Sequence, residues 1–449
     1  MSALAAGDTI VAPVTPPGRG GVCIVRLSGP EALRLATQIA GALPPPRHAA
    51  LRELRVAGEP LDRGLVLVFA APRSFTGEDS VEFQLHGSPV VAALLVRGLV
   101  ALGAREAGPG EFTRRAFLNG RLDLAQAEAI ADLIASASAE AARAALRSLE
   151  GEFSSRVTAL VEQLTRLRIR LEAGLDFPEE GVDDLDDPEL AGHLDELLCE
   201  LLAVRQAAER GRVLRDGLTL VIAGPPNAGK SSLLNRLAGY EAAIVTELPG
   251  TTRDLVREDI LIDGMPVRVV DTAGLREASD RVEQEGIRRA REAMARADLV
   301  LLVEDGDRAD AAGDLTGLPT GVPVLRLRNK TDLLGLPAGF ETAPDGAERL
   351  RLSAQTGAGL ELLRERLQNI AGHGAGEGGS FAARRRHLEA LDIAAAAVQA
   401  ALGLLRTGYA PELAAEELRQ AQERLGEITG ELTTEDLLGR IFSEFCIGK

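Results

Sequence analysis

The sequence predicts a multidomain protein: a small N-terminal α/β domain, then an all-α helical domain that is split in sequence by a second, inserted α/β domain. Three observations predict this order. Strand-like runs alternate with turns over residues 1–120, helical spacing of Ala, Leu and Glu fills 121–212 and returns over 381–449, and a strand-rich region occupies 216–370. We expect the domain boundaries at these positions.

Composition narrows the class of protein. The 449 residues carry a net charge of −17, which argues against a general polyanion-binding protein. No apolar run reaches the ~18 residues that span a bilayer, and the N-terminus lacks a basic region followed by an apolar core. Cys23, Cys199 and Cys446 lie far apart, in no metal-binding spacing. We therefore expect a cytoplasmic protein that does not bind a membrane.

The first 120 residues contain the short elements of an α/β domain. Gly21–Leu27, Gly64–Phe69 and Ser80–His86 are strand-like, and Val90–Ala101 is helix-like.

The next region has the spacing of long helices. Asp123–Leu149 is one such stretch, and an acidic break that contains proline follows at Asp176–Pro188. A glycine-rich spacer, Gly372–Gly379, precedes the return of helical spacing. The simplest arrangement is one helical domain whose two halves flank the inserted domain.

The inserted domain opens with a phosphate-binding loop. Leu218–Ala223 is a buried-strand candidate that leads into Gly224-Pro-Pro-Asn-Ala-Gly-Lys-Ser231, a match to G-x-x-x-x-G-K-[ST] in its strand–loop–helix context. The glycines let backbone amides turn toward phosphates. Lys230 would neutralise the β- and γ-phosphates, and Ser231 would offer its hydroxyl to Mg²⁺.

Three further elements follow in the order of a guanine-nucleotide site, each after a strand-like run. Asp271-Thr-Ala-Gly274 places a carboxylate to reach Mg²⁺ through water and an amide to sense the γ-phosphate. In Asn329-Lys-Thr-Asp332 the last carboxylate can accept two hydrogen bonds that guanine offers and adenine does not. Ser353-Ala354 fits the loop behind the base. The sequence therefore predicts a GTP site.

The group that activates water is not evident from spacing. Many regulatory GTPases have glutamine where this chain has Leu275. Glu283 is a candidate for orienting water, although spacing alone favours a solvated carboxylate at a helix start. Thr252, within Gly250-Thr-Thr-Arg-Asp254, is a natural ligand of Mg²⁺ and the γ-phosphate. Asn227 either coordinates a monovalent cation beside the phosphates or shapes the loop.

Lysine is nearly absent from the chain. Of 50 basic residues only three are lysines: Lys230, Lys330 and Lys449. One interpretation is coding bias plus chance. The other is that these positions need an ammonium group, which differs from guanidinium in shape and hydration. Lys330 can lie with its stem along the base.

Further motifs run from one terminus to the other. They are Asp8-Thr-Ile-Val-Ala12, Pro16-Pro-Gly-Arg-Gly-Gly21, Ser74-Phe-Thr-Gly-Glu-Asp79, Pro109-Gly-Glu-Phe112, Arg115-Ala-Phe-Leu-Asn119, Leu122–Ile134, Gly250–Asp254, Asp271–Arg276 and the C-terminal Cys446-Ile-Gly-Lys449. In these motifs the whole chain resembles the MnmE (TrmE) family of tRNA modification GTPases. The resemblance implies a tetrahydrofolate-binding-like N-terminal α/β domain, a discontinuous all-α helical domain and an inserted Ras-like α/β P-loop GTPase domain.

The resemblance also implies site residues. Glu283 would position the catalytic water, Mg²⁺ would contact Ser231 and Thr252, and K⁺ would contact Asn227, Thr246, Leu248 and Thr251. A 5-formyl- or 5,10-methylene-tetrahydrofolate would contact Arg26, Glu82, Arg121 and Lys449, with Cys446 lining the site. The nucleotide would contact Asn227, Ala228, Gly229, Lys230, Ser231, Ser232, Thr246, Thr251, Thr252, Asp271, Thr272, Ala273, Gly274, Asn329, Lys330, Asp332, Ser353 and Ala354.

Two positions depart from the family pattern. Arg121 stands where relatives often have lysine, and Pro225 where arginine is common. Acyl or methyl transfer through the Cys446 thiolate is the alternative to its lining the site.

The implied reaction adds a carboxymethylaminomethyl group to carbon five of the wobble uridine of certain tRNAs. The chain would be a homodimer that forms a heterotetramer or larger complex with an FAD-containing MnmG-type partner, and tRNA would bind largely through that complex. GTP hydrolysis stimulated by K⁺ would drive rearrangement of the GTPase domains.

Two other classes of function compete. A regulatory GTPase of ribosome assembly would usually carry an RNA-binding module after the GTPase region, where this chain returns to Ala/Leu/Glu-rich helices. A helical scaffold with a degenerate nucleotide site is disfavoured by intact Lys230, Ser231, Asp271 and Asp332.

Overall fold

The structure is a computed structural model. It describes residues 7–176, 188–225, 227–238, 257–262, 265–271, 294, 297–306, 322–343, 346–370, 380–407, 410–431, 435–443, 445–446 and 448. The chain divides into two compact units. The first consists of Met1–Ala131, Leu149–Leu185 and Ala410–Lys449, and the second of Asp132–Ser148 and Asp186–Tyr409. The fold is multidomain, as the sequence predicts.

The first unit contains a six-stranded sheet in the order β3-β4-β5-β2-β1-β6. Its strands are β1 (Ile10–Pro13), β2 (Gly20–Ser28), β3 (Ala50–Val56), β4 (Glu59–Phe69), β5 (Ser80–Gly87) and β6 (Arg105–Glu106).

The two faces of this sheet differ. Val25, Val66 and Phe83 point to one face, where they form a core with helices α1 (Ala32–Ala40) and α2 (Pro89–Ala101). Leu51 and Leu65 pair in register on the opposite face and remain 50% and 38% exposed. These two leucines therefore lie on the face that α1 and α2 do not cover.

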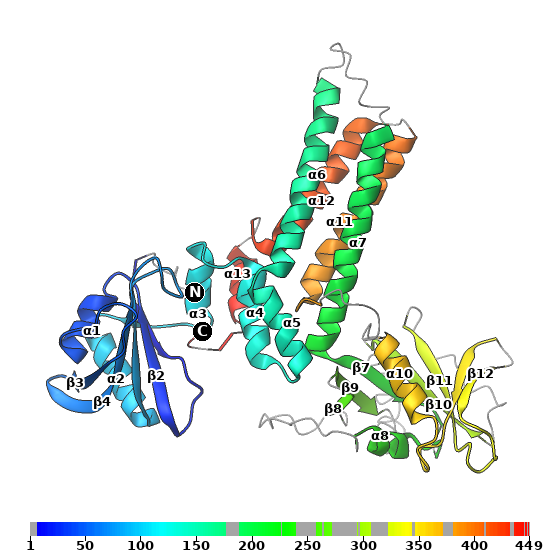
Figure 1. The fold of residues 1–449 in the computed structure, drawn as a ribbon, viewed down its shortest axis with the longest axis horizontal. Helices are drawn as coiled ribbons and strands as arrows, with labels where there is room; N and C mark the ends of the chain where they lie inside the picture. The colour runs from blue at the N-terminus through cyan, green and yellow to red at the C-terminus, as the bar shows by residue number, and fades with distance from the viewer. Residues whose placement is uncertain are drawn as a thin grey trace, which may run out of the picture. The chain divides into compact units, whose positions relative to one another are not determined.

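Helices make up the rest of the first unit: α3 (Glu111–Leu118), the start of α4 (Leu124–Ala135), α6 (Glu152–Asp176), α12 (Pro411–Thr429) and α13 (Glu435–Ser443). Helices α6 and α12 lie side by side although about half the chain separates them (Figure 1). Arg168 of α6 donates to Gln422 Oε1 of α12 at 2.6 Å. The C-terminal helix α13 packs against the start of α4 through an apolar cluster that includes Leu124 and Phe442.

The second unit contains the end of α4, nearly all of α5 (Ala139–Leu149) and the long helix α7 (Pro188–Asp216), which packs along α11 (Arg385–Arg406) (Figure 1). By length and composition α11 is long and apolar enough to cross a membrane, although Asp392 and Gln399 keep its unbroken apolar runs well short of the ~18 residues considered above. Val398, Ala401 and eight other residues of α11 are nevertheless buried, and the helix lies against α7. We therefore interpret α11 as a core helix of the helical region.

The remainder of the second unit is a seven-stranded sheet in the order β12-β13-β11-β10-β7-β9-β8. Its strands are β7 (Leu218–Ala223), β8 (Arg257–Ile262), β9 (Met265–Asp271), β10 (Leu299–Asp305), β11 (Val324–Asn329), β12 (Gly339–Thr342) and β13 (Glu348–Arg351). The five central strands are parallel, and the two edge strands, β8 and β12, are antiparallel to their neighbours.

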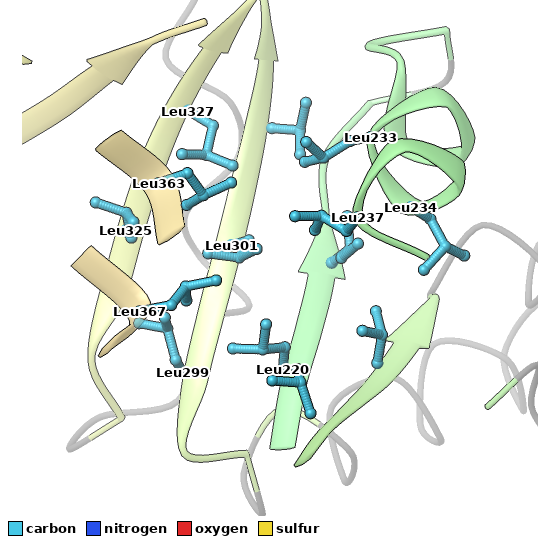
Figure 2. Packing of buried hydrophobic residues seen from close by; sticks show 14 of the residues in the cluster. Leu220, Leu233, Leu234, Leu237, Leu299, Leu301, Leu325, Leu327, Leu363 and Leu367 are labelled. Carbon is cyan, nitrogen blue, oxygen red and sulfur yellow. The ribbon is translucent and has the colours of Figure 1, made fainter. Parts of the chain in front are cut away.

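Two helices cover one face of this sheet. Leucines of α8 (Lys230–Ala238) and α10 (Leu360–Ile370) pack on Leu220, Leu301 and Leu327 of the central strands (Figure 2). A second apolar cluster, around Val221 and Val300, lies on the other face, so the sheet buries apolar side chains on both sides. Parallel strands share one carboxyl edge, so the loops that follow β7, β10 and β11 meet there.

Most predicted elements are confirmed, and β7 has the predicted bounds. The helical stretch Asp123–Leu149 is two helices, because α4 ends at Ala135 and α5 starts at Ala139. Ser138 caps the second helix, its Oγ accepting the Ala141 amide at 3.1 Å. The predicted glycine-rich spacer Gly372–Gly379 lies outside the described residues. So does the acidic break Asp176–Pro188 except for its two end residues, which end α6 and begin α7.

Candidate functional site

The phosphate-binding loop follows β7 and ends where α8 begins at Lys230. Gly224 and Gly229 have φ angles of 145° and 93°, and Asn227 has φ of 62°. A Cβ at Gly224 would lie 2.2 Å from Val303 O, and one at Gly229 would lie 2.2 Å from Asn329 Nδ2. Both positions therefore require glycine for close approach as well as for conformation. Left-handed residues in a loop before a helix make a concave row of amides that suits an anion.

The Lys230 side chain hydrogen-bonds back to the start of this loop. Its Nζ donates to Gly224 O at 3.0 Å and Pro225 O at 2.8 Å, and the residue is 7% exposed. A buried ammonium at a helix N-terminus creates a strongly positive position for a phosphate. Ser231 and Ser232, in the first turn of α8, are exposed.

Asn329 joins the phosphate loop to the predicted base-binding loops. Its Nδ2 donates to Ala228 O at 2.8 Å, its Oδ1 accepts the Ala354 amide at 2.9 Å, and it is 2% exposed. Ser353 is fully buried, and its Oγ accepts the Thr356 amide at 3.1 Å. One side chain thus fixes three segments that the sequence assigns to the same nucleotide.

Two more predicted base-site residues lie on the loop after β11. Lys330 has φ of 62°, and its Nζ lies 2.8 Å from Asp305 Oδ2. Asp332 is exposed. The Thr331 amide donates to Leu352 O at 3.3 Å, which holds this loop against the segment that contains Ser353.

Asp271 is the last residue of β9, where its backbone pairs with Ile222 two residues before Gly224. The Asp271 side chain is not among the parts of the chain that the structure describes. The other predicted residues of the switch region also lie outside the described residues: Thr246, Leu248, Thr251, Thr252, Thr272, Ala273, Gly274 and Glu283.

A second candidate site lies on the first unit's sheet. Arg26 of β2 and Glu82 of β5 are register partners, joined by a hydrogen bond of 2.9 Å from Arg26 Nε. The Arg26 guanidinium lies 5.0 Å from the centre of the Phe75 ring and 5.5 Å from that of Phe112. Two aromatic faces and a carboxylate therefore fix the guanidinium. Neither ring is among the site residues predicted from the sequence, although Phe75 lies in the motif Ser74–Asp79 and Phe112 in the motif Pro109–Phe112.

Two more predicted folate-site segments lie in the same unit: Arg121 and the C-terminal tail. A Cβ at Gly77 would lie 3.2 Å from Arg121 Cγ, so the arginine stem packs on the loop before β5. Cys446 O accepts the Gly110 amide at 3.3 Å, and a Cβ at Gly448 would lie 2.1 Å from Pro13 O. The tail thus packs tightly beside β1 and the start of α3. Cys446 is exposed, and Lys449 lies outside the described residues.

A charged network lies at the start of β1. Asp8 accepts a hydrogen bond from Arg105 at 2.7 Å and pairs with Arg115, and Glu111 accepts from Arg105 at 2.6 Å and Arg115 at 3.1 Å. Burial alone would raise the pKa of each carboxyl, but these hydrogen bonds outweigh burial and lower the pKa of Asp8 and of Glu111. The network ties β1, β6 and α3 together.

Among the described residues, no cluster of three or more His, Cys, Asp or Glu side chains is arranged to hold a metal ion. Cys23, which is half-buried, accepts a hydrogen bond from Thr15 Oγ1 at 3.2 Å.

Comparison with known proteins identifies relatives along the whole chain. Residues 9–121 match the model of the GTP-binding protein TrmE N-terminus, and residues 124–446 match the model of the MnmE helical domain. The tRNA modification GTPase MnmE of Alkalilimnicola ehrlichii is 55% identical over 99% of this chain and 100% of its own length. The protein of that name from Pseudomonas paraeruginosa is 56% identical over the same shares.

A solved structure also matches part of the chain. It is a GTP-binding protein from Sulfolobus solfataricus in complex with GDP, with a TM-score of 0.27 and 19% identity over 48% of this chain and 68% of that one. A score this low supports no argument about fold or function. The family models and the relatives alone carry the assignment, and on them the chain belongs to the MnmE (TrmE) family of tRNA modification GTPases.

Proposed function

We propose that this chain hydrolyses GTP to drive a tRNA modification, the addition of a carboxymethylaminomethyl group to carbon five of the wobble uridine. The observation that carries the GTP-dependent part is the joining of phosphate loop and base loops by Asn329. The tRNA-dependent part rests on the relatives named tRNA modification GTPase.

The geometry supports the proposed nucleotide site. Lys230 would exchange its contacts with loop carbonyls for the β- and γ-phosphates, and Asp332 would bind the guanine edge. The exposed hydroxyl of Ser231 at the start of α8 fits a Mg²⁺ ligand, with Thr252 as its proposed partner. The exposed, left-handed Asn227 fits a K⁺ ligand, together with Thr246, Leu248 and Thr251. The bound cations would supply positive charge beside the phosphates.

The remaining nucleotide contacts in the proposal are Ala228, Gly229, Ser232, Asp271, Thr272, Ala273, Gly274, Lys330, Ser353 and Ala354.

Glu283 is the residue proposed to orient the attacking water. Glu283→Ala should bind GTP with unchanged affinity and lower kcat by about a hundredfold. Single-turnover hydrolysis and nucleotide titration measure the two effects separately, and normal turnover would remove Glu283 from the mechanism.

The cation proposal has its own test. GTP hydrolysis by the full chain should be faster in K⁺ than in Na⁺ at equal ionic strength, and Asn227→Ala should reduce the difference. Equal rates in the two salts would reject a specific monovalent cation.

A reduced folate is the ligand proposed for the first unit. A 5-formyl- or 5,10-methylene-tetrahydrofolate carries acidic and hydrogen-bonding groups, which the fixed Arg26 guanidinium and the Glu82 carboxylate fit. Arg121, Lys449 and the site-lining Cys446 complete the proposed set. Calorimetric titration with 5-formyltetrahydrofolate should show saturable binding that Arg26→Ala abolishes.

The chain is proposed to form a homodimer through its N-terminal domain. The uncovered sheet face with Leu51 and Leu65 supports this assembly. Leu51→Asp should yield monomers in sedimentation velocity. Val90→Asp is the matched control, since Val90 is 65% exposed on α2, on the helix-covered side of the sheet. Monomers in both variants, or in neither, would contradict this interface.

The larger assembly is proposed to include an FAD-containing MnmG-type partner, with tRNA bound largely through the complex, in the cytoplasm. The proposed domains are 1–120, 121–212, 216–370 and 381–449.

Mass spectrometry of wobble nucleosides from a strain that lacks this gene tests the reaction: the modified uridine should disappear. Unchanged nucleosides with defective ribosome assembly would favour a regulatory GTPase instead.

A further inference from the structure

Lys330 is held by a neighbour that the nucleotide motifs do not include. Its Nζ lies 2.8 Å from Oδ2 of Asp305, the last residue of β10. Asp305 pairs in register with Asn329, the last residue of β11. The Asp305 carboxylate therefore lies at the end of the strand next to the one that precedes Lys330. The lysine side chain extends over the carboxyl edge of the sheet to reach it.

The Asp305–Lys330 pair is poorly suited to stabilising the fold. Its side chains are 25% and 31% exposed, and ion pairs with such access to water contribute little to the stability of a fold. Lys330 also adopts the left-handed region at φ 62°, which is unfavourable for a residue with a long side chain. An unfavourable backbone and a weak ion pair at one position indicate a requirement of the site.

We propose that Asp305 is a positioning residue of the guanine site: it anchors the Lys330 ammonium so that the lysine stem forms a fixed wall for one face of the base. The inference rests on the proposed nucleotide site and adds to it a residue outside the four nucleotide motifs. It also gives a reason for one of the three lysines in a chain whose other basic residues are arginines. A compact ammonium can be held by one carboxylate while its flexible stem stays flat, whereas a planar guanidinium would impose its own geometry.

The test compares GDP with IDP, which lacks the exocyclic amine that Asp332 reads. Asp305→Asn should weaken both by the same factor, about fivefold, because the stem contacts the ring face and not the amine. In GTP hydrolysis KM should rise while kcat at saturation stays unchanged, since the effect is on ground-state and transition-state binding alike. Asp305→Glu should recover part of the affinity.

A double-mutant cycle separates anchoring from general damage. Lys330→Met keeps most of the stem but removes the ammonium, so it should lose as much affinity as Asp305→Asn, and the double variant should lose no more. Asp392→Asn is the matched control: Asp392, on α11, also forms an ion pair of 2.8 Å, with Arg205 of α7, and its loss should leave nucleotide affinity unchanged.

The outcomes are distinguishable. Additive losses in the double variant, or an altered ratio of GDP to IDP affinity in Asp305→Asn, would overturn the positioning role. Unchanged affinity in a folded Asp305→Asn protein would also overturn it while leaving the GTP site intact. Absence of GDP binding in the unaltered chain would instead reject the proposed function itself.

Discussion

At the scale of single residues, the candidate GTP site depends on one amide side chain. Asn329 satisfies a carbonyl of the phosphate loop and an amide of the loop behind the base, and it is almost fully buried. Only a side chain with both a donor and an acceptor can do this. The predicted base motif is therefore also a structural joint between loops.

Asn329→Ala tests this joint. The change leaves Ala228 O and the Ala354 amide without these hydrogen bonds, each at a cost of about 1–3 kcal/mol. We expect a lower melting temperature and weaker GDP binding. Asn235→Ala, at an exposed position on α8, is the control and should change neither. Thermal denaturation with and without GDP measures both, and a protein with wild-type affinity would show that the loops hold their positions without Asn329.

At the scale of elements, four strands share a buried ionic network. Glu304 of β10 pairs with Arg326 of β11 at 2.7 Å and with Arg349 of β13 at 3.1 Å, and all three are at most 7% exposed. Arg349 also pairs with Glu341 of the edge strand β12 at 2.7 Å. Because the parallel register brings these residues to one face, the network fixes the order of strands beneath the base loop.

Glu304→Gln should destabilise the protein by about 3–5 kcal/mol, because it leaves two buried guanidiniums without this negative partner. Glu348→Gln, which removes the exposed pair with Arg366, should cost less than about 1 kcal/mol. Urea denaturation of the two variants gives the comparison. Equal, small losses would show that the other partners of the arginines compensate.

The charged network at the start of β1 predicts a pH dependence. The ordinary pKa values of Asp8 and Glu111 are 3.8 and 4.5, and folding lowers both. Folding therefore favours the ionised forms, so their contribution is complete above pH 4.5 and is lost as the pH falls through the lowered values. The free energy of unfolding should decrease from about pH 5 to pH 3, and less steeply in Glu111→Gln. An identical pH profile in the variant would exclude Glu111 as a source.

Local features of the structure could be predicted from the sequence, whereas contacts between side chains of separate elements could not. The strand before Gly224, the phosphate loop and the helix after it follow from a motif within 14 residues, Leu218–Ser231, because turn chemistry and capping are local. Phe75 and Phe112 around Arg26, and Asp305 beside Lys330, come from separate elements whose register no local pattern contains. Helix α11 shows a limit of composition, because an apolar composition alone does not distinguish a core helix from a membrane span.

At the scale of the whole molecule, segments that lie on opposite sides of the insertion in the sequence pack against each other. In the second unit the segment before α11 passes between α5 and α7. Arg147 of α5 donates to Ser380 O at 2.8 Å, and the Ala382 amide donates to Ala144 O at 3.2 Å. Asp132 accepts hydrogen bonds from Arg215 at 2.8 Å and Arg384 at 2.9 Å, which ties the ends of three helices. Parts of the chain from both sides of the insertion are thus needed to complete one helical core.

The close packing of α7 against the segment before α11 predicts stability changes of opposite sign for alanine substitutions at two glycines of α7. A Cβ at Gly211 would lie 1.4 Å from Phe381 O, whereas one at Gly192 would meet nothing within 4 Å. Alanine in a helix is ordinarily about 1 kcal/mol better than glycine, so Gly192→Ala should stabilise the protein slightly. Gly211→Ala should lose about 1–3 kcal/mol or more, because the buried backbone at Phe381 must move away. Chemical denaturation of both variants measures the difference. Stabilisation by both would mean that residues 380–383 do not pass against α7 in solution, and the packing of the split helical region would have to be redrawn.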